Sequence, residues 1–336
     1  MIPDNDNIFY YYDVIDSEHI RCNLCRHNCT LKNSQVGVCG VNQNIDARLE
    51  TLVYGHPIAI HIDPVEKKPL YHMLPNSKVL SFGTVGCNFK CPFCQNWDIS
   101  QTNKIDENIY VSPQDMVDLA IKHDAKSIAY TYNEPTIFYP YAKDIGVLAK
   151  QQGIKNIFVS NGFETLEMIA DMSNWVDAVN VDLKNWDEEY YKKVLKGGLG
   201  EVKEALEEFV KRGIWLEVTT LLIDGLNSSD EDIKSMALFI STKLGSDIPW
   251  HLSAFYPNYK MQDTPPTQVD TLLRAKDIAK EYGLKYVYLG NINQPQYTKC
   301  PHCDTIVISR AYGKVISHLK ADKCQVCGSD IKGVWY

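Results

Sequence analysis

The sequence predicts an α/β protein built around a partial (β/α)6 barrel, with a four-cysteine appendage before the barrel and a zinc-ribbon-like domain after it. Two observations support this prediction. From residue 78 onward, short β-rich runs alternate with helical stretches, which is the pattern of βα units around a parallel sheet. The eleven cysteines form three groups, one inside the alternating region and one on each side of it.

The same pattern divides the chain into an N-terminal cysteine-rich metal-binding region at 1–76, the barrel at 77–291 and the C-terminal domain at 292–336. In the first part, β-rich runs predict strands at 48–54 and 57–62. Seven strands with helices between them are predicted for the barrel, at residues 79–84, 127–131, 156–160, 178–183, 215–222, 251–255 and 286–289. Six βα units with a closing strand suit an incomplete barrel.

The alternation alone fits either a barrel or an open doubly wound sheet, because both consist of βα repeats. The polar motifs favour the barrel. The cysteine loop 87–94 and the segments 133–135 (NEP), 160–162 (SNG) and 182–184 (DLK) each follow a successive strand. On a barrel the carboxyl ends of these strands meet at one rim, whereas in an open sheet the outer ones would be far apart.

The composition is that of an ordinary globular protein, with 45% hydrophobic and 23% charged residues in 336. A net charge of −8 disfavours a nucleic-acid reader, because nonspecific affinity for phosphate backbones comes from Lys and Arg. Residues 1–20 lack the basic and apolar regions of a signal peptide, and no run of about eighteen apolar residues occurs. We therefore expect a cytoplasmic protein without a membrane segment.

The central cysteines, Cys87, Cys91 and Cys94, have the spacing C-x3-C-x2-C. Three thiolates bind three irons of a [4Fe–4S] cluster and leave the fourth iron without a protein ligand. An iron with a vacant position can bind and polarise a small molecule, whereas a fully ligated cluster mainly moves electrons. The triad therefore predicts a reaction.

The flanking cysteines predict metal ligation rather than disulfides, because they are tightly spaced in a chain without a secretion signal. The N-terminal quartet fits either zinc or an auxiliary iron–sulfur cluster and consists of Cys22, Cys25, Cys29 and Cys39. The C-terminal quartet has the two-knuckle spacing of a zinc ribbon and consists of Cys300, Cys303, Cys324 and Cys327. A mononuclear iron would take the same four C-terminal ligands.

The central triad, with the aromatic Phe93 before its last cysteine, resembles the signature of the radical S-adenosylmethionine (radical SAM) superfamily. Residues 86–100 (GCNFKCPFCQNWDIS), 63–75 (DPVEKKPLYHMLP) and 130–135 (YTYNEP) resemble the radical enzymes of the AmmeMemoRadiSam system, relatives of the pyruvate formate-lyase activating enzyme. The resemblance runs from about Cys22 to the C-terminus. It implies a [4Fe–4S] cluster, S-adenosylmethionine, and a 5′-deoxyadenosyl radical that abstracts hydrogen from a substrate.

The resemblance also assigns cofactor contacts. The residues are Phe93, Asn133, Glu134, Ser160, Asn161, Asp182, Lys184 and His251. Glu134 matches the glutamate that contacts the cofactor ammonium, although Tyr132 and Asn133 stand where relatives carry glycines. Lys184 matches a cation that serves the cofactor carboxylate, and His251 matches a histidine near the ribose. For the run 66–68 (EKK) and for His72, a solvated charge run is the expected structure.

The expected function is that of a radical SAM enzyme whose substrate is a protein or another bulky molecule. Metal-stabilised appendages at both ends of the barrel motivate this expectation, since they make rigid docking surfaces. A glycyl-radical enzyme activase and a non-catalytic electron-transfer or metal-sensing protein are the alternatives. Expected partners are an electron donor such as flavodoxin or ferredoxin, and Memo-like and AMMECR-like proteins, whose genes commonly accompany this family.

Overall fold

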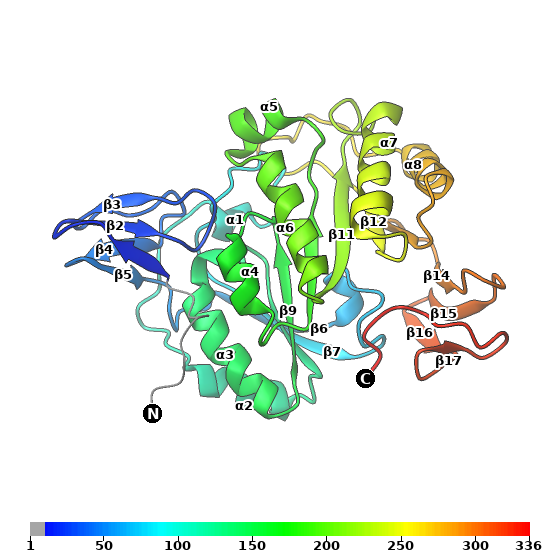
Figure 1. The fold of residues 1–336 in the computed structure, drawn as a ribbon, viewed down its shortest axis with the longest axis horizontal. Coiled ribbons are helices and arrows are strands. Elements are labelled where there is room, and N and C mark those ends of the chain that lie inside the picture. The colour runs from blue at the N-terminus through cyan, green and yellow to red at the C-terminus, as the bar shows by residue number, and fades with distance from the viewer. Residues whose placement is uncertain (1–10) are drawn as a thin grey trace.

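The central element of the fold is an eight-stranded sheet whose strands stand in chain order, from β6 at one edge to β13 at the other (Figure 1). The computed structural model describes residues 11–336. Neighbouring strands from β7 to β13 are parallel, and only β6 runs antiparallel to its neighbour. The bounds are β6 Ala59–Pro64, β7 Lys78–Gly83, β8 Ser127–Tyr130, β9 Lys155–Ser160, β10 Ala178–Asp182, β11 Trp215–Leu222, β12 Trp250–Ala254 and β13 Val287–Gly290.

The strand order confirms a parallel α/β sheet and separates the two predicted topologies. A doubly wound sheet reverses its strand order at a switch point, and this sheet has no reversal along its described strands. All seven parallel strands were predicted to within about one residue at each end, because fully buried strands read as short apolar runs bounded by turn residues.

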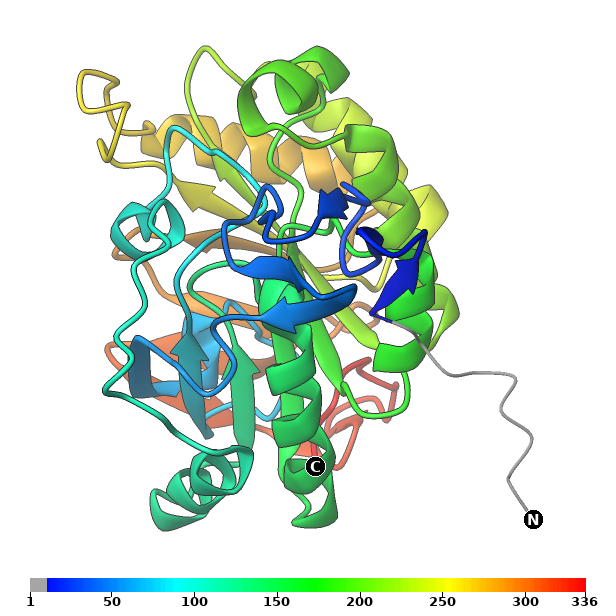
Figure 2. The ribbon, with the colours of Figure 1, turned by 90° about the vertical axis from the view of Figure 1, so that its left-hand side faces the viewer.

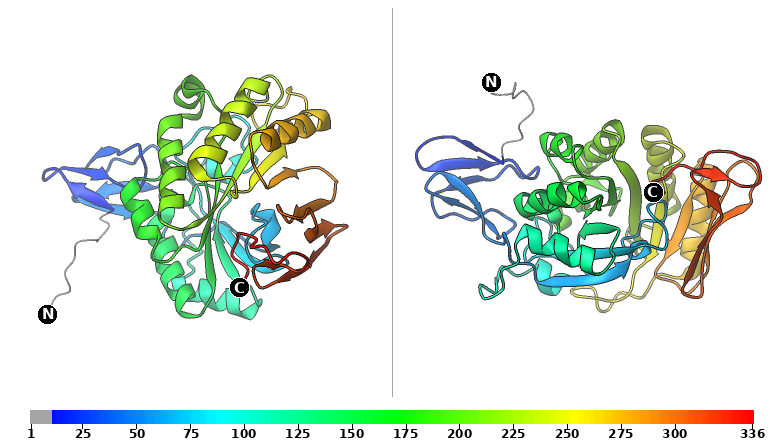
Figure 3. Two further views of the ribbon diagram at one scale, coloured as in Figure 1. Left: turned by 45° about the vertical axis from the view of Figure 1, so that its right-hand side comes forward. Right: turned by 90° about the horizontal axis from the view of Figure 1, so that it is seen from below.

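The helices lie mainly on the outer face of the curved sheet, as the two views of Figure 3 show. Within residues 11–336, none of them is both long and apolar enough to cross a membrane. The α-helices are α1 Trp97–Ser100, α2 Pro113–Lys122, α3 Tyr139–Gln151, α4 Leu166–Met172, α5 Glu188–Tyr190, α6 Leu199–Lys211, α7 Asp230–Phe239 and α8 Val269–Glu281. Short 3-10 turns occupy Val65–Lys67 and Pro135–Phe138, and π-helical turns occupy Tyr191–Leu195 and Ile240–Leu244.

The N-terminal region packs as two small sheets against one side of the barrel (Figure 2). Its strands are β1 Tyr12–Val14, β2 His19–Cys22 and β3 Thr30–Lys32 in one sheet, and the hairpin β4 Asn42–Ile45 and β5 Arg48–Thr51. The strand predicted at 57–62 does not belong here. It is β6, which extends the central sheet beside β7, so the sheet begins before the predicted boundary at residue 76.

The C-terminal region lies on the opposite side of the barrel from the N-terminal sheets (Figure 3). Its strands are β14 Gln296–Lys299, β15 Ile306–Ala311, β16 Lys314–Ser317, β17 Leu319–Lys320 and β18 Lys323–Cys324. The region shares a hydrophobic cluster with the barrel, in which Val307 and Ile308 pack with Tyr286 and Tyr288. Val334 also pairs with Met73, which joins the end of the chain to the segment after β6.

Candidate functional site

A cavity of about 450 Å³ lies at the carboxyl ends of the parallel strands. It is bordered by loops that follow β7, β8, β9 and β10, and by side chains of β11 and β12. Every side chain assigned from sequence to the central cluster or its cofactor lines this one cavity. These residues are Cys87, Cys91, Phe93, Cys94, Asn133, Glu134, Ser160, Asn161, Asp182, Lys184 and His251.

The three cysteines lie on a loop that is anchored on both sides. Gly86 has a φ of 90°, and a Cβ there would lie 2.7 Å from the carbonyl oxygen of Cys39, so glycine permits a close approach to the N-terminal region. Phe89 is buried and makes an edge contact with Phe163, with ring centroids 5.2 Å apart. A Cβ at Gly197 would collide with the Phe89 ring, so the glycine makes room for this anchor.

Burial dominates the chemistry of the cysteine thiols. It raises the pKa of the Cys91 thiol to about 12, against a smaller lowering by Lys184, and it also raises the pKa of Cys87 and Cys94. A buried thiolate needs a nearby positive charge, and metal ions supply one by binding the deprotonated sulfur. Three such thiols on one loop therefore fit a metal cluster.

Glu134 faces the cysteine loop from the end of β8 and is only 2% exposed. One of its carboxylate oxygens accepts from the Ser160 hydroxyl at 3.0 Å, and the other accepts from the backbone N–H of Asn161 at 2.7 Å. Burial raises the pKa of Glu134, although these hydrogen bonds oppose the effect. The carboxylate is held rigidly where it can meet a cationic group of a ligand.

Tyr132 adopts the left-handed backbone conformation that a glycine would adopt, with a φ of 69°. The side chain is held by a hydrogen bond from its hydroxyl to Asp63 Oδ2 at 3.1 Å, and Lys68 Nζ lies 5.0 Å from the ring centroid. These contacts offset the cost of the left-handed conformation for a residue that has a Cβ.

Asn133 lines the cavity, but its side chain is committed to the cysteine loop. Its Oδ1 accepts from the backbone N–H of Thr84 at 3.1 Å, and its Nδ2 donates to the carbonyl oxygen of Gly86 at 2.9 Å. Asn133 was predicted to contact the cofactor. These hydrogen bonds tie the motif after β8 to the loop after β7, and the predicted contact with the cofactor stays a prediction.

Asp182 and Lys184 form an ion pair at the end of β10, with Lys184 Nζ 2.7 Å from Asp182 Oδ2. The lysine side chain is 13% exposed. Burial lowers the pKa of Lys184, but the Asp182 carboxylate outweighs this effect and the pKa lies above its ordinary value. Lys184 is thus a permanent cation beside the cysteine loop, as its predicted role requires.

His251 is positioned by Glu217, a residue that the sequence analysis did not single out. His251 Nε2 and Glu217 Oε2 are 2.6 Å apart, and both side chains are almost fully buried. Glu217 also accepts from the backbone N–H of Tyr71 at 3.0 Å and of His72 at 2.7 Å. The sequence does carry a signal for Glu217, which is a charged residue in the strand predicted at 215–222. Because a buried charge requires a partner, this glutamate indicates a buried polar contact.

The charge run at 66–68 is not solvated as predicted. The Lys68 side chain is 4% exposed and lies 2.8 Å from Asp63 Oδ2, and His72 is fully buried. Burial lowers the pKa of His72 to about 4, so its ring is neutral. The prediction fits only the Lys67 side chain, which is 68% exposed. The prediction was wrong because it considered the run 66–68 alone, whereas the ion-pair partner of Lys68 is Asp63, which lies before the run.

Glu164 is a second buried carboxylate behind Glu134 and was not predicted. The Ser160 hydroxyl reaches both carboxylates, and Oε2 of Glu164 has no hydrogen-bond partner among the described residues. Burial, with a further contribution from the charge of Glu134, raises the pKa of Glu164 from 4.5 to about 8. Glu164 therefore holds its proton more tightly than an exposed glutamate does.

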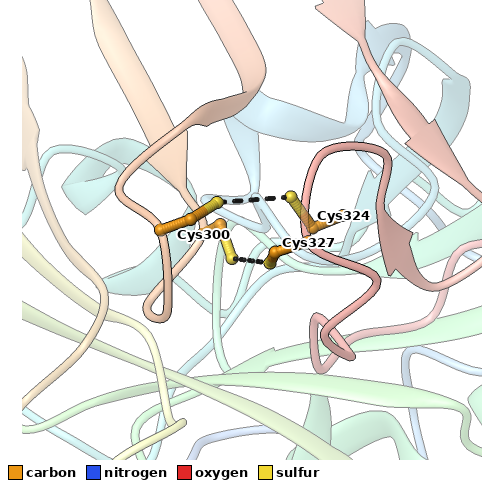
Figure 4. Close-up of side chains that lie close together, drawn as sticks. Cys300, Cys324 and Cys327 are labelled. Carbon is orange, nitrogen blue, oxygen red and sulfur yellow. Dashed lines mark hydrogen bonds between the residues drawn. The ribbon is translucent and has the colours of Figure 1, made fainter.

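The C-terminal quartet is preorganised for one metal ion. Its four sulfur atoms all lie within 4.8 Å of one another, and Figure 4 shows the two knuckles facing each other. The Cys300 and Cys327 sulfurs are 3.5 Å apart, and those of Cys303 and Cys324 are 3.7 Å apart. A tetrahedral ion with metal–sulfur bonds of about 2.3 Å separates its ligands by about 3.8 Å, so the geometry fits such an ion.

Comparison with known proteins shows which family the chain resembles. The family model of the Radical SAM superfamily matches residues 82–240. The uncharacterized protein MJ0808 of Methanocaldococcus jannaschii is 38% identical over 96% of this chain and 97% of its own length. The putative glycyl-radical enzyme activating enzyme MJ1632 of that organism is 26% identical over 59% of this chain and 76% of its own.

Among solved structures, a radical SAM methyltransferase from Sphaerobacter thermophilus has a similar fold. The TM-score is 0.52 at 17% sequence identity, and the match covers 66% of this chain and 67% of that one. The similarity extends the family match to the arrangement of strands and helices.

The raised pKa of Glu164 predicts a pH-dependent stability. Because the folded protein holds this proton more tightly than the unfolded chain, stability falls as the pH rises from about 4.5 to about 8. Glu164→Gln cannot ionise, so its free energy of unfolding should fall less across that window in urea titrations. Glu281→Gln, at an exposed position of α8, is the control and should follow the wild type. An unchanged pH profile for Glu164→Gln would contradict the assignment.

Proposed function

This chain belongs to the radical SAM superfamily, and on that premise we propose that it holds a [4Fe–4S] cluster through Cys87, Cys91 and Cys94 and cleaves S-adenosylmethionine. One observation carries the proposal. The three thiols share a single cavity with a buried carboxylate, Glu134, and a buried cation, Lys184. When bound, the cluster and S-adenosylmethionine supply an electron and the 5′-deoxyadenosyl radical that abstracts hydrogen from a substrate.

The charged residues of the cavity match the two charged ends of an amino acid group. In this proposal, Glu134 accepts from the ammonium and Lys184 donates to the carboxylate. Both residues line the cavity, which supports the assignment. A lysine suits this task because its point charge does not demand bidentate geometry. Ser160 and Asn161 fix Glu134, and Glu217 fixes His251, so binding costs little rearrangement.

The cavity can also exclude water from a reactive intermediate. Its volume of about 450 Å³ is that of a small-molecule site, and Phe93 and Phe89 contribute buried apolar walls. Excluding water strengthens the electrostatic contacts inside and prevents side reactions. A protein that only transfers electrons would not need such a cavity, which favours the catalytic function.

The finer assignment is to an enzyme of the AmmeMemoRadiSam type that acts on a protein or another bulky molecule, with Memo-like and AMMECR-like proteins as partners and a flavodoxin or ferredoxin as electron donor. A stacked aromatic pair, of which Trp97 is exposed and Tyr259 is partly buried, supports a bulky substrate. Trp97, which follows the cavity-lining Asn96, is 44% exposed and stacks on Tyr259 with ring centroids 5.2 Å apart. The backbone N–H of Lys260 donates to the carbonyl oxygen of Pro92, which joins this aromatic surface to the cysteine loop.

A second candidate is activation of a glycyl-radical enzyme, which the similarity to a relative with that name favours. It also takes a protein as substrate and uses the same cavity. The two candidates differ in whether a backbone glycine of the substrate loses the hydrogen.

If the proposed reaction is right, cleavage of S-adenosylmethionine should depend on the three central cysteines. Protein reconstituted anaerobically with iron and sulfide, and then reduced strongly, should convert S-adenosylmethionine into 5′-deoxyadenosine and methionine, as measured by chromatography. Cys87→Ala, Cys91→Ala and Cys94→Ala should each abolish the conversion, because the two thiolates that remain in each variant are too few to hold the cluster. Cleavage by the triple variant at the wild-type rate would contradict the proposal.

The charged contacts predict a loss of cofactor affinity without loss of the cluster. Glu134→Gln and Lys184→Met should each weaken S-adenosylmethionine binding by about 1.5–3 kcal/mol, measured by equilibrium dialysis of the loaded protein. Glu281→Gln and Lys122→Met change exposed charges on α8 and α2 and serve as controls. Unchanged affinity in both cavity variants would refute these assignments.

The C-terminal quartet is proposed to hold zinc and to stabilise its region. Elemental analysis of anaerobically purified protein should find about one equivalent of zinc, which Cys300→Ser combined with Cys324→Ser should remove. The melting temperature should fall in the same variant, because Cys300 and Cys324 both belong to the hydrophobic cluster that contains Tyr286 and Tyr288. Iron at this quartet, detected by anomalous scattering, would be the contrary result.

If the substrate is a protein, its hydrogen should be transferred to 5′-deoxyadenosine. When candidate partner proteins are prepared in deuterated medium, mass spectrometry should detect deuterium in 5′-deoxyadenosine and a changed residue in one partner. Unlabelled partners are the control and should give no deuterium. A small metabolite that supports rapid deuterium transfer, with no modified protein, would show that the substrate is small.

A further inference from the structure

We propose that Cys22, Cys25, Cys29 and Cys39 hold a second iron–sulfur cluster, rather than a zinc ion, directly beside the loop of the central cysteines. The sequence leaves these two metal groups as equal alternatives. The spacing of the sulfur atoms and their position beside the central cysteine loop favour the cluster. The inference goes beyond the proposed reaction and does not require that S-adenosylmethionine is cleaved.

The spacing of the sulfur atoms is the first argument. The ligands of one zinc ion crowd around a point, about 3.8 Å apart, whereas each thiolate of a cuboidal cluster binds a different corner and stands further from the others. Among the described residues, only the C-terminal quartet brings three or more ligand atoms within 4.8 Å of one another. The N-terminal quartet does not, and neither does the central triad, which the superfamily uses for a cluster.

The surroundings of the sulfur atoms suit a cluster but do not exclude zinc, since cysteines of the C-terminal quartet also have backbone N–H donors. Backbone N–H groups of Leu24, His27 and Val38 donate to the sulfurs of Cys22, Cys25 and Cys29. The side-chain amide of Asn42 lies 3.5 Å from the sulfur of Cys39. Each of the four sulfurs therefore has an N–H donor. Hydrogen bonds to the cysteine sulfurs are one of the means by which proteins set the reduction potential of an iron–sulfur cluster.

The site is small and largely enclosed. All four cysteines line one small pocket together with apolar atoms of Leu24, Val38 and Ile137. Cys22, Cys25 and Cys39 are buried, and Cys29 is partly buried. Gly37 lies against the sulfurs, since a Cβ there would be 3.6 Å from that of Cys29 and 3.8 Å from that of Cys39.

The site is joined directly to the central cysteine loop. His27, between the second and third cysteines of the quartet, makes a 3.0 Å hydrogen bond through Nε2 to the carbonyl oxygen of Asn88. The carbonyl oxygen of Cys39 closely approaches Gly86, the residue before Cys87. Two groups that exchange single electrons would therefore lie on chain segments that contact each other. A zinc ion, which has no redox chemistry, would gain nothing from this proximity.

The test removes the central cluster and asks what remains. The triple variant Cys87→Ala, Cys91→Ala, Cys94→Ala, reconstituted anaerobically with iron and sulfide, should retain about four irons and four sulfides per chain. Mössbauer spectra of the iron-57-enriched protein should show cluster iron. The matched control adds Cys22→Ser and Cys39→Ser and should lose this iron. Zinc at the quartet, iron without sulfide, or no metal in the triple variant would overturn the proposal.

A measurement on the wild-type chain guards against variants that fail to fold. Full reconstitution should give about eight irons, from two clusters of four, and about one zinc at the C-terminal quartet. Anomalous scattering should place iron at the N-terminal quartet and zinc at the C-terminal one. Iron at the central triad with zinc at both quartets would overturn the inference and leave the proposed reaction standing. If iron occupies both the N-terminal quartet and the central triad but S-adenosylmethionine is not cleaved, the inference stands and the proposed reaction is contradicted.

Discussion

Charge buried in the interior of the barrel must be compensated, and this requirement governs the arrangement of the whole site. An unpaired charge in a low-dielectric interior costs several kcal/mol, so each buried charged group needs a partner. Glu217 pairs with His251, Asp63 with Lys68, and Asp182 with Lys184. Each pair fixes the orientation of a cavity wall. The cysteine thiols follow the same rule, since they can become thiolates at neutral pH only beside a cation or a metal.

The parallel sheet places these groups together. Because the strands from β7 to β13 run in one direction and in chain order, the residues that follow each strand meet at one rim. Asn133 then connects the loops after two neighbouring strands, and Ser160 connects Glu134 to Glu164. The site is therefore rigid because of hydrogen bonds between loops, and not only because of the sheet beneath it.

The sequence could predict the parallel strands, the cysteine groups and the cavity residues of the motifs after β7, β8, β9 and β10, because strand patterns and ligand spacing are local properties. It did not place Glu66 and Lys67, which also line the cavity. It could not predict features that depend on distant partners. Glu217 is held by the backbone of His72, 145 residues away. Tyr132 stands where relatives carry a glycine, and contacts with Asp63 and Lys68 hold the side chain of this residue, whose backbone is left-handed. The boundary at residue 76 was misplaced for the same reason, since β6 belongs to the sheet through pairing with β7.

The central claim is that three thiolates leave one iron open to S-adenosylmethionine in this cavity. To test it directly, the N-terminal quartet is removed by Cys22→Ser and Cys39→Ser, and the remaining cluster is enriched in iron-57. Mössbauer spectra recorded with and without S-adenosylmethionine should show a change at one iron in four, because only the iron without a cysteine can gain ligands. Spectra that do not change at saturating S-adenosylmethionine would contradict the account.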